Sequence, residues 1–162
     1  EVSPKLTQRV MSSLLWLDSQ SQEPIKLYIN TPGGSADDGF AIFDLIRFIK
    51  APVTNISFGL NASAGTIILL GAPMERRLAL PNSRIMIHQP MLMGYQGRAA
   101  DCEIQAKEIL KTRDHLINLY SEQTGRDYEE IKQAIDRDNW FTAQEALEFG
   151  LLDSIVKNRS EL

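Results

Sequence analysis

Ser63 is the first residue whose setting suggests chemistry. It lies between two alanines in "GLNASAGTIILL", residues 59–70, where a strand-like run gives way to an apolar helix. A helix start favours developing negative charge, and the backbone N–H of Ala64 can donate to an oxyanion without any side-chain requirement. Because a serine at this position also suits a plain helix N-cap, the segment by itself predicts either role.

A reactive serine needs a base, and the sequence offers two histidines. His115 falls on the same helical face as Glu108 and Lys111, which is typical of a solvated surface histidine. His88 ends the otherwise apolar run "RIMIH", where an aliphatic residue would serve a purely structural role better. We therefore interpret His88 either as a catalytic base or as a structural histidine.

The remaining parts of a hydrolytic site are a carboxylate that orients the base and donors that stabilise the oxyanion. Among 21 acidic residues, Asp136 and Asp138 of "AIDRDNW" lie on a predicted loop beside Trp140. Either carboxylate could hold an imidazole tautomer, and helix termination is the alternative role of both. The tandem glycines of "NTPGGS", residues 30–35, allow the backbone to approach a bound carbonyl and to present N–H groups to it.

The elements that must position these residues alternate between strands and helices, which predicts a sheet covered by helices. The predicted strands cover 25–30, 52–58, 76–80 and 84–88, with a turn between the last two. The predicted helices begin at Ser3 and Pro4, cover 40–49, 64–72 and 99–124, and begin again at the capping-box patterns Asp127/Glu130 and Thr142/Glu145.

The composition limits the classes of protein to which the chain can belong. A length of 162 residues with 43% hydrophobic content predicts one domain, and a net charge of −4 with dispersed basic residues argues against a nucleic-acid partner. No apolar run reaches transmembrane length, which predicts a soluble protein without a membrane partner. The single Cys102 excludes an internal disulfide and a cysteine zinc cluster, and we interpret it as a small buried residue on a helix.

Several segments occur together in the order and approximate spacing found in the ClpP family, the proteolytic subunits of the Clp protease. They are "LYINTPGGS", "ASAG", "ALPNSRIMIHQP", "YQGRAADCEIQAKEIL" and "DRDNWFTAQEALEFGLLD". The chain resembles this family from Leu14 to Val156. The resemblance implies an α/β, crotonase-like fold of repeated strand-strand-helix units with a protruding handle helix. It also implies a single peptidase domain over 1–162, with a head at about 1–90 and 136–162 and a handle at about 91–135.

The resemblance further implies a serine endopeptidase that hydrolyses unfolded polypeptides to short peptides inside a ring-stacked chamber. The family's nucleophile corresponds to Ser63, its base to His88 and its acid to Asp138 of "RDNW". Its oxyanion donors correspond to the backbone N–H groups of Gly34 and Ala64. The order serine, histidine, aspartate differs from that in α/β-hydrolases, chymotrypsin-like and subtilisin-like enzymes, although the chemical roles are the same.

Assembly and partners are implied by the same resemblance. Two stacked heptamers, or a mixed ring with paralogues, would receive unfolded proteins from an AAA+ Clp unfoldase. Asp136, Arg137 and Gln96 would lie at the contact between rings. Because the unfoldase uses the ATP, no cofactor and no metal is expected in this subunit. The implied compartment is the cytoplasm, or alternatively the plastid stroma or the mitochondrial matrix.

Two segments depart from the family pattern. "ASAG" replaces the usual "ASMG", which keeps the backbone donor of Ala64 but alters the pocket wall. "MLMGYQG" has Leu92 and Met93 where paired glycines normally receive the substrate strand. An alternative interpretation is therefore a weakly active or silent structural subunit of a mixed Clp ring. A third is an acyl-CoA enzyme of the same fold, because fold alone does not determine function.

Overall fold

The computed structural model describes residues 1–92, 94 and 96–162. Met93 and Tyr95, which belong to the unusual "MLMGYQG" segment, lie outside the described residues. The described backbone divides into two units, residues 1–87 with 140–162 and residues 88–139. The head and handle boundaries implied by the resemblance stay a prediction.

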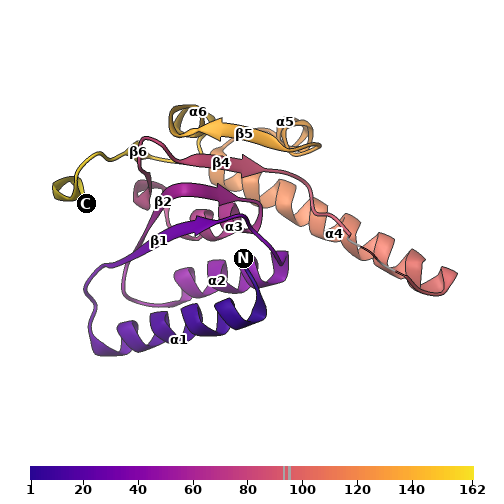
Figure 1. The fold of residues 1–162 in the computed structure, drawn as a ribbon, viewed down its shortest axis with the longest axis horizontal. Coiled ribbons are helices and arrows are strands. Elements are labelled where there is room, and N and C mark those ends of the chain that lie inside the picture. The colour runs from indigo at the N-terminus through magenta and orange to yellow at the C-terminus, as the bar shows by residue number, and fades with distance from the viewer. Residues whose placement is uncertain (93, 95) are drawn as a thin grey trace. The chain divides into compact units, whose positions relative to one another are not determined.

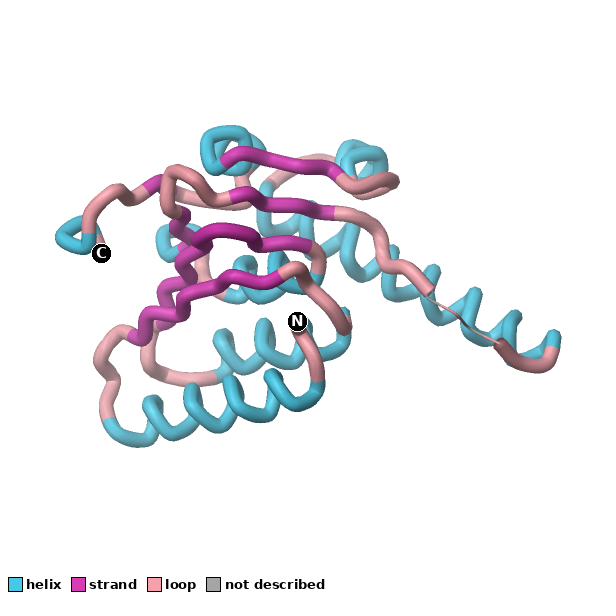
Figure 2. The backbone as a smooth tube through the Cα atoms, viewed as in Figure 1, coloured by secondary structure: helices cyan, strands magenta, loops and turns pink. Residues whose placement is uncertain are grey.

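Six strands form one sheet in the described part of the chain (Figure 1), and Figure 2 shows them in magenta. They are β1 (Ile25–Thr31), β2 (Val53–Ala62), β3 (Arg77–Ala79), β4 (Arg84–Ile87), β5 (Asn139–Thr142) and β6 (Ser154–Ile155). Their order is β5-β4-β2-β3-β6, and β1 pairs with the other edge of β2. The pairs β1–β2, β2–β3, β2–β4 and β3–β6 are parallel. Because β2 has neighbours on both edges, it is the strand around which the sheet is built.

The chain passes twice along the same edge of β2. As predicted, β3 and β4 are two short strands joined by a turn, and both run parallel to β2. The turn between them stays attached to β2 because the Leu80 N–H and the Ser83 hydroxyl both donate to the Ser57 carbonyl, at 2.9 and 2.8 Å. β4 therefore ends beside Ala62, the last residue of β2.

The described residues of the first unit include four α-helices. They are α1 (Pro4–Gln20), α2 (Ala36–Phe48), α3 (Ala64–Gly71) and α6 (Ala143–Phe149). The predicted Ser3 cap starts α1, and Thr142 with Glu145 forms the predicted capping box of α6. α2 packs against both α1 and α3 (Figure 1). Every residue of α3 is buried, so this short apolar helix belongs to the core.

The sequence patterns miss β5 and β6. β6 has only two residues, and β5 follows a polar stretch without the alternation that marks a strand. Aromatic contacts hold β5 instead, because Phe141 is buried with its ring centroid 4.9 Å from that of Phe149. The guanidinium of Arg84 lies 4.3 Å from the ring centroid of Trp140.

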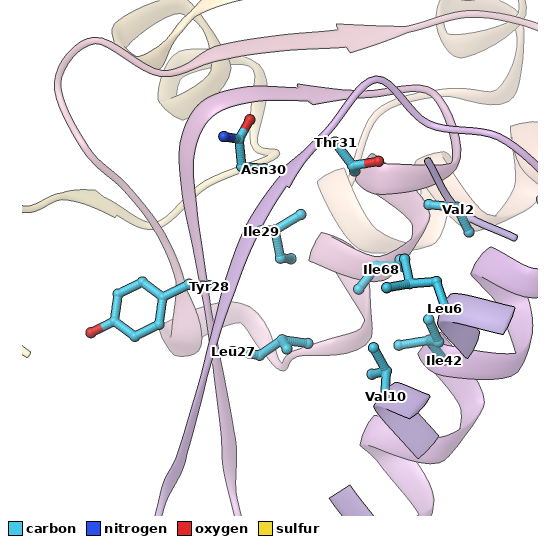
Figure 3. A pocket seen from close by; sticks show the side chains of 10 residues that line it. All are labelled: Val2, Leu6, Val10, Leu27, Tyr28, Ile29, Asn30, Thr31, Ile42 and Ile68. Carbon is cyan, nitrogen blue, oxygen red and sulfur yellow. The ribbon is translucent and has the colours of Figure 1, made fainter. Parts of the chain in front are cut away.

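An apolar groove of about 150 Å³ lies between α1 and β1 (Figure 3). Leu27 and Ile29 of β1 point toward this groove, whereas Tyr28 points to the opposite side of the strand, as strand alternation requires. None of the residues that line the groove is acidic, basic or a histidine. The groove therefore lacks the carboxylates, amines and imidazoles that acid–base catalysis most often uses.

The described part of the second unit contains α4 (Ala99–Thr124) and α5 (Tyr128–Ala134). As predicted, α4 is long and ends at Gly125, whose φ of 72° places it in the left-handed region. Its buried residues are Leu116, Ile117, Leu119 and Tyr120. The interpretation of Cys102 as a buried residue is wrong, because it lies in the unburied N-terminal half of α4. His115 is exposed, as predicted.

The start of α5 differs in detail from the predicted capping box. Asp127 is the N-cap, and its carboxylate accepts a hydrogen bond from the Glu129 N–H at 2.9 Å. Glu130 instead accepts a hydrogen bond from the guanidinium of Arg126. A nearby cation therefore competes successfully with the backbone for the Glu130 carboxylate.

In the part of the chain that the structure describes, no helix is long and apolar enough to cross a membrane. Likewise, no group of three or more His, Cys, Asp or Glu side chains within these residues is arranged to hold a metal ion.

Arg77 and Asp153 form a buried connection between β3 and the C-terminal segment. The Arg77 N–H donates to Asp153 Oδ2, and the Asp153 N–H donates to the Arg77 carbonyl, both at 2.8 Å. Arg77 is only 2% exposed, and Asp153 Oδ1 is buried without a hydrogen-bond partner. Burial raises the pKa of Asp153, although the backbone N–H and the guanidinium of Arg77 act in the opposite direction.

We predict that Asp153 makes stability depend on pH. Because its pKa is raised by folding, the folded state binds the proton more tightly, and stability is lost as pH rises through the raised pKa. Urea unfolding of the native protein and of Asp153→Asn should show that the native protein gains stability relative to the variant as pH falls from about 7 to about 4. Parallel stability curves for the two proteins would contradict the prediction.

Candidate active site

Ser63 joins the end of β2 to the start of α3 in an unusual backbone conformation. Its φ of 54° and ψ of −123° make it the one non-glycine residue with positive φ in the described ranges. Its N–H donates to the Met86 carbonyl of β4 at 2.9 Å, and its carbonyl accepts from both the N–H and the hydroxyl of Thr66, at 2.9 and 2.7 Å. Hydrogen bonds on both sides of the residue therefore hold a conformation that costs about 1–3 kcal/mol elsewhere.

The structure distinguishes between the two roles predicted for Ser63, a plain helix N-cap and a reactive serine. It occupies the N-cap position of α3, but its side chain makes no capping hydrogen bond to the helix. An ordinary serine cap has extended backbone geometry and accepts from the helix N-terminus, as Ser35 does for Asp38 at the start of α2. A strained strand-to-helix turn without a side-chain cap is instead the arrangement that projects a nucleophile from a sheet edge.

Gly33 brings the "NTPGGS" loop directly against Ser63. A Cβ atom on Gly33 would lie 2.5 Å from Ser63 Cβ and 2.7 Å from the Ala62 carbonyl oxygen. It would also lie 3.1 Å from the backbone nitrogen of Ala64. Gly33 has a φ of 96°, so this position requires glycine both for its conformation and for the space.

The predicted oxyanion donors, Gly34 and Ala64, directly follow the two residues of this close approach, Gly33 and Ser63. Gly33 donates to Thr31 Oγ1 at 3.2 Å and Ser35 donates to the Val2 carbonyl at 3.0 Å, so these contacts leave the Gly34 N–H between them for another acceptor. Ala64 is the first residue of α3, where a backbone N–H has no acceptor within the helix. Both groups therefore suit an anion beside Ser63.

His88 and Asp138 contact each other directly in the second unit. His88 Nδ1 lies 2.9 Å from Asp138 Oδ1, and the side chains are 12% and 59% exposed, respectively. Because a carboxylate can only accept, the shared proton belongs to Nδ1, and Nε2 is the basic nitrogen. Residue types alone left Asp136 and Asp138 as alternatives, and the family resemblance assigned the acid to Asp138; it is Asp138 that contacts His88.

The segment before Asp138 carries the residues expected at the ring contact. Arg137 Nη1 donates to the Asp136 carbonyl at 2.9 Å and lies 3.8 Å from Asp136 Oδ2. Asp136, Arg137 and Gln96 are all exposed, and their role between rings stays a prediction. Gln89 belongs to the "HQP" motif, and the sequence predicted no role for it. Its amide donates to Asp136, and both residues help to line a depression of about 490 Å³ that includes His88.

A family model described as Clp protease matches residues 1–159. The chain belongs to the Clp protease family. This membership confirms the predicted resemblance and decides against an acyl-CoA enzyme of the same fold. It also confirms the prediction of a serine-type endopeptidase.

Curated relatives and a solved structure agree with the family assignment. The chain is 55% identical over 141 residues to "ATP-dependent Clp protease proteolytic subunit 1" of Protochlamydia amoebophila, covering 86% of this chain and 68% of that relative. It is 48% identical to "ATP-dependent Clp protease proteolytic subunit 2" of Treponema denticola, covering 100% and 81%. A mutant ClpP1 structure from Listeria monocytogenes superimposes with a TM-score of 0.90 at 41% identity, covering 98% of this chain and 88% of that one. The predicted ClpP-type α/β fold is confirmed.

We predict that Gly33→Ala disrupts the setting of Ser63. The new Cβ would clash with Ser63 and should cost about 1–3 kcal/mol of stability. Labelling of Ser63 by a fluorophosphonate should slow in the variant. Gly125→Ala is the matched control, because Gly125 also has positive φ but a Cβ there would meet nothing within 4 Å. Equal labelling rates in the two variants would contradict the prediction.

We also predict that glycine is more stable than alanine at position 63. Glycine adopts positive φ without the steric penalty of a Cβ, so Ser63→Gly should exceed Ser63→Ala by about 1 kcal/mol in the free energy of unfolding. The same pair of substitutions at Ser12, an exposed position within α1, should show the opposite order, because glycine weakens a helix. Urea unfolding of the four variants measures both differences, and greater stability of alanine at position 63 would show that its backbone is not strained.

Proposed function

We propose that this member of the Clp protease family hydrolyses peptide bonds with a triad of Ser63, His88 and Asp138. The observation that carries the proposal is the hydrogen bond between His88 Nδ1 and Asp138 Oδ1, which fixes the tautomer that a general base requires. The strained backbone of Ser63 supports its assignment as the nucleophile. Family membership supports the use of these parts for proteolysis.

The proposed reaction follows from the donors and acceptors of these residues. His88 Nε2 takes the hydroxyl proton as Ser63 Oγ attacks the scissile carbonyl carbon. The N–H groups of Gly34 and Ala64 stabilise the tetrahedral oxyanion, and His88 then gives its proton to the leaving amine. Water then attacks the resulting ester as His88 Nε2 takes a proton from it, and His88 returns that proton to Ser63 Oγ as the acid product leaves. Asp138 stays ionised and stabilises the imidazolium.

The chain is proposed to act within a larger ATP-dependent complex. Its relatives are named proteolytic subunits of an ATP-dependent Clp protease, which supports a partner unfoldase that uses the ATP and delivers unfolded proteins. We propose two stacked heptamers, with Asp136, Arg137 and Gln96 at the contact between rings. No cofactor or metal takes part in the proposed reaction. A cytoplasmic compartment fits the bacterial origin of these relatives.

A weakly active or silent subunit of a mixed ring is the second candidate. The observation that favours it is the "MLMG" segment, where exposed Leu92 stands in place of a family glycine. The presence of serine, histidine and aspartate at the three family positions favours the active subunit. The active and silent subunits can be distinguished by measuring assembly mass and peptidase activity for the protein alone and for its mixture with a paralogue. A silent subunit gains assembly or activity only in the mixture.

We predict that Ser63 is the residue labelled by a fluorophosphonate probe. Peptide mapping of the assembled native protein should place the label on Ser63. Ser63→Ala should abolish both labelling and peptide cleavage while the assembly mass is unchanged. An assembled native protein that takes up no probe at Ser63 would refute the proposed nucleophile.

We predict that activity depends on Asp138, the proposed acid of the triad. Asp138→Asn keeps the size of the side chain but offers His88 the wrong tautomer, so kcat for a small peptide should fall by roughly 10⁴-fold. Asp44→Asn on α2 is the control, because it changes an exposed carboxylate outside the proposed triad. Equal kcat values for the Asp138 and Asp44 variants would show that Asp138 does not orient the base.

A further inference from the structure

Gln89 is bonded to the segment that carries Asp138 by both its backbone and its side chain. The Gln89 N–H donates to the Ile135 carbonyl at 2.6 Å. Its side-chain amide donates to the Asp136 carbonyl at 2.8 Å and to Asp136 Oδ1 at 3.2 Å. Three hydrogen bonds therefore join Gln89 to two consecutive residues, Ile135 and Asp136.

These bonds lie next to the contact between the base and the acid. Gln89 follows His88 directly, and Asp136 precedes Asp138 by two residues. The His88–Asp138 hydrogen bond and the Gln89 bonds therefore connect the same two stretches of chain, residues 88–89 and 135–138. A shift of either stretch that breaks the Gln89 bonds would also move His88 relative to Asp138.

Asp138 needs such support because burial does not hold it in place. Its side chain is 59% exposed, so packing does little to restrict its position. Two side-chain bonds from Gln89 to the Asp136 main chain and carboxylate restrict the turn that leads to Asp138. One of the two acceptors is an ionised carboxylate, which gives a stronger hydrogen bond than a neutral acceptor.

We infer that Gln89 is a positioning residue, which holds the segment of Asp138 so that its carboxylate orients His88. The inference rests on the proposed triad and extends it to a residue that does not itself touch the substrate. Orientation of a base affects the chemical step more than substrate binding, so removal of the Gln89 amide lowers kcat and leaves KM nearly unchanged.

The first test compares Gln89→Ala with the native protein as assembled particles of known mass. The kcat for a small peptide should fall by about 10- to 100-fold, with little change in KM. Gln144→Ala is the matched control, because it removes an amide that donates to Glu148, and both of these α6 side chains are exposed. Native kcat per assembled Gln89→Ala particle would overturn the inference, even if fewer particles assemble, because the residue would then have only a structural role.

The second test reverses the hydrogen bond between the two side chains. Gln89→Glu places a carboxylate against Asp136 and should lower kcat at least as far as Gln89→Ala. Adding Asp136→Asn supplies an amide that can donate to the new carboxylate, and it should restore part of the lost kcat. If Gln89→Ala does not assemble, the comparison of Gln89→Glu with the combined variant Gln89→Glu/Asp136→Asn tests the positioning role instead. Equal kcat values for these two variants would overturn the inference.

Peptide hydrolysis by the native protein distinguishes failure of the positioning role of Gln89 from failure of the proposed function. Hydrolysis by the native protein that depends on Ser63 is measured first with the same peptide. If the native protein shows none, the proposed function fails. If the native and Gln89→Ala proteins hydrolyse the peptide equally well, only the positioning role of Gln89 is refuted.

Discussion

Ser63 keeps a backbone conformation that glycine prefers, and the surrounding structure is arranged so that an L-residue can hold it. Its N–H is bound by β4, its carbonyl is bound by Thr66, and the helix that follows is buried along its whole length. The absence of a side chain at Gly33 then provides the space beside Ser63 Cβ. The energy stored in one strained residue is therefore balanced by the sheet, by the core helix and by a glycine loop.

The base and the acid are held by a different kind of interaction. The Asp138 side chain is 59% exposed and that of His88 is 12% exposed, and hydrogen bonds join the two short stretches that carry them, 88–89 and 135–138. The amide of Gln89 can serve two acceptors on one residue, which a hydroxyl or an aliphatic side chain cannot do. Packing therefore fixes Ser63, the proposed nucleophile, whereas a small polar network fixes His88 and Asp138, the proposed base and acid.

Local sequence patterns predicted the helices and strands that have clear apolar periodicity or capping residues. The strands that lead to Ser63 and His88, the long α4 and the capping box at Thr142 all follow from apolar periodicity and capping chemistry. β5 escaped prediction because tertiary contacts of Trp140 and Phe141, rather than alternation, make it a strand. Cys102 was misplaced because helical spacing predicts a helix but does not tell how much of its length is covered.

The candidate site was harder to derive from residue types alone. The sequence could propose Ser63, but the positive φ that distinguishes it from an ordinary cap depends on contacts with β4 and Thr66, which are set by the fold. Residue types likewise could not choose between Asp136 and Asp138, which are only two residues apart; the family resemblance chose Asp138, and the structure places it against His88. The role of Gln89 has no signal of its own, since its partners lie more than forty residues away in the chain.

The complete burial of α3 has a consequence for how activity can be regulated. Any displacement of the Ser63 peptide would require eight core residues to repack, which is costly in an interior with native packing density. The stretch that carries Asp138 is exposed and is held by a few polar contacts, so modest forces can change its geometry. A change in geometry is therefore easier at Asp138, the proposed acid, than at Ser63, the proposed nucleophile.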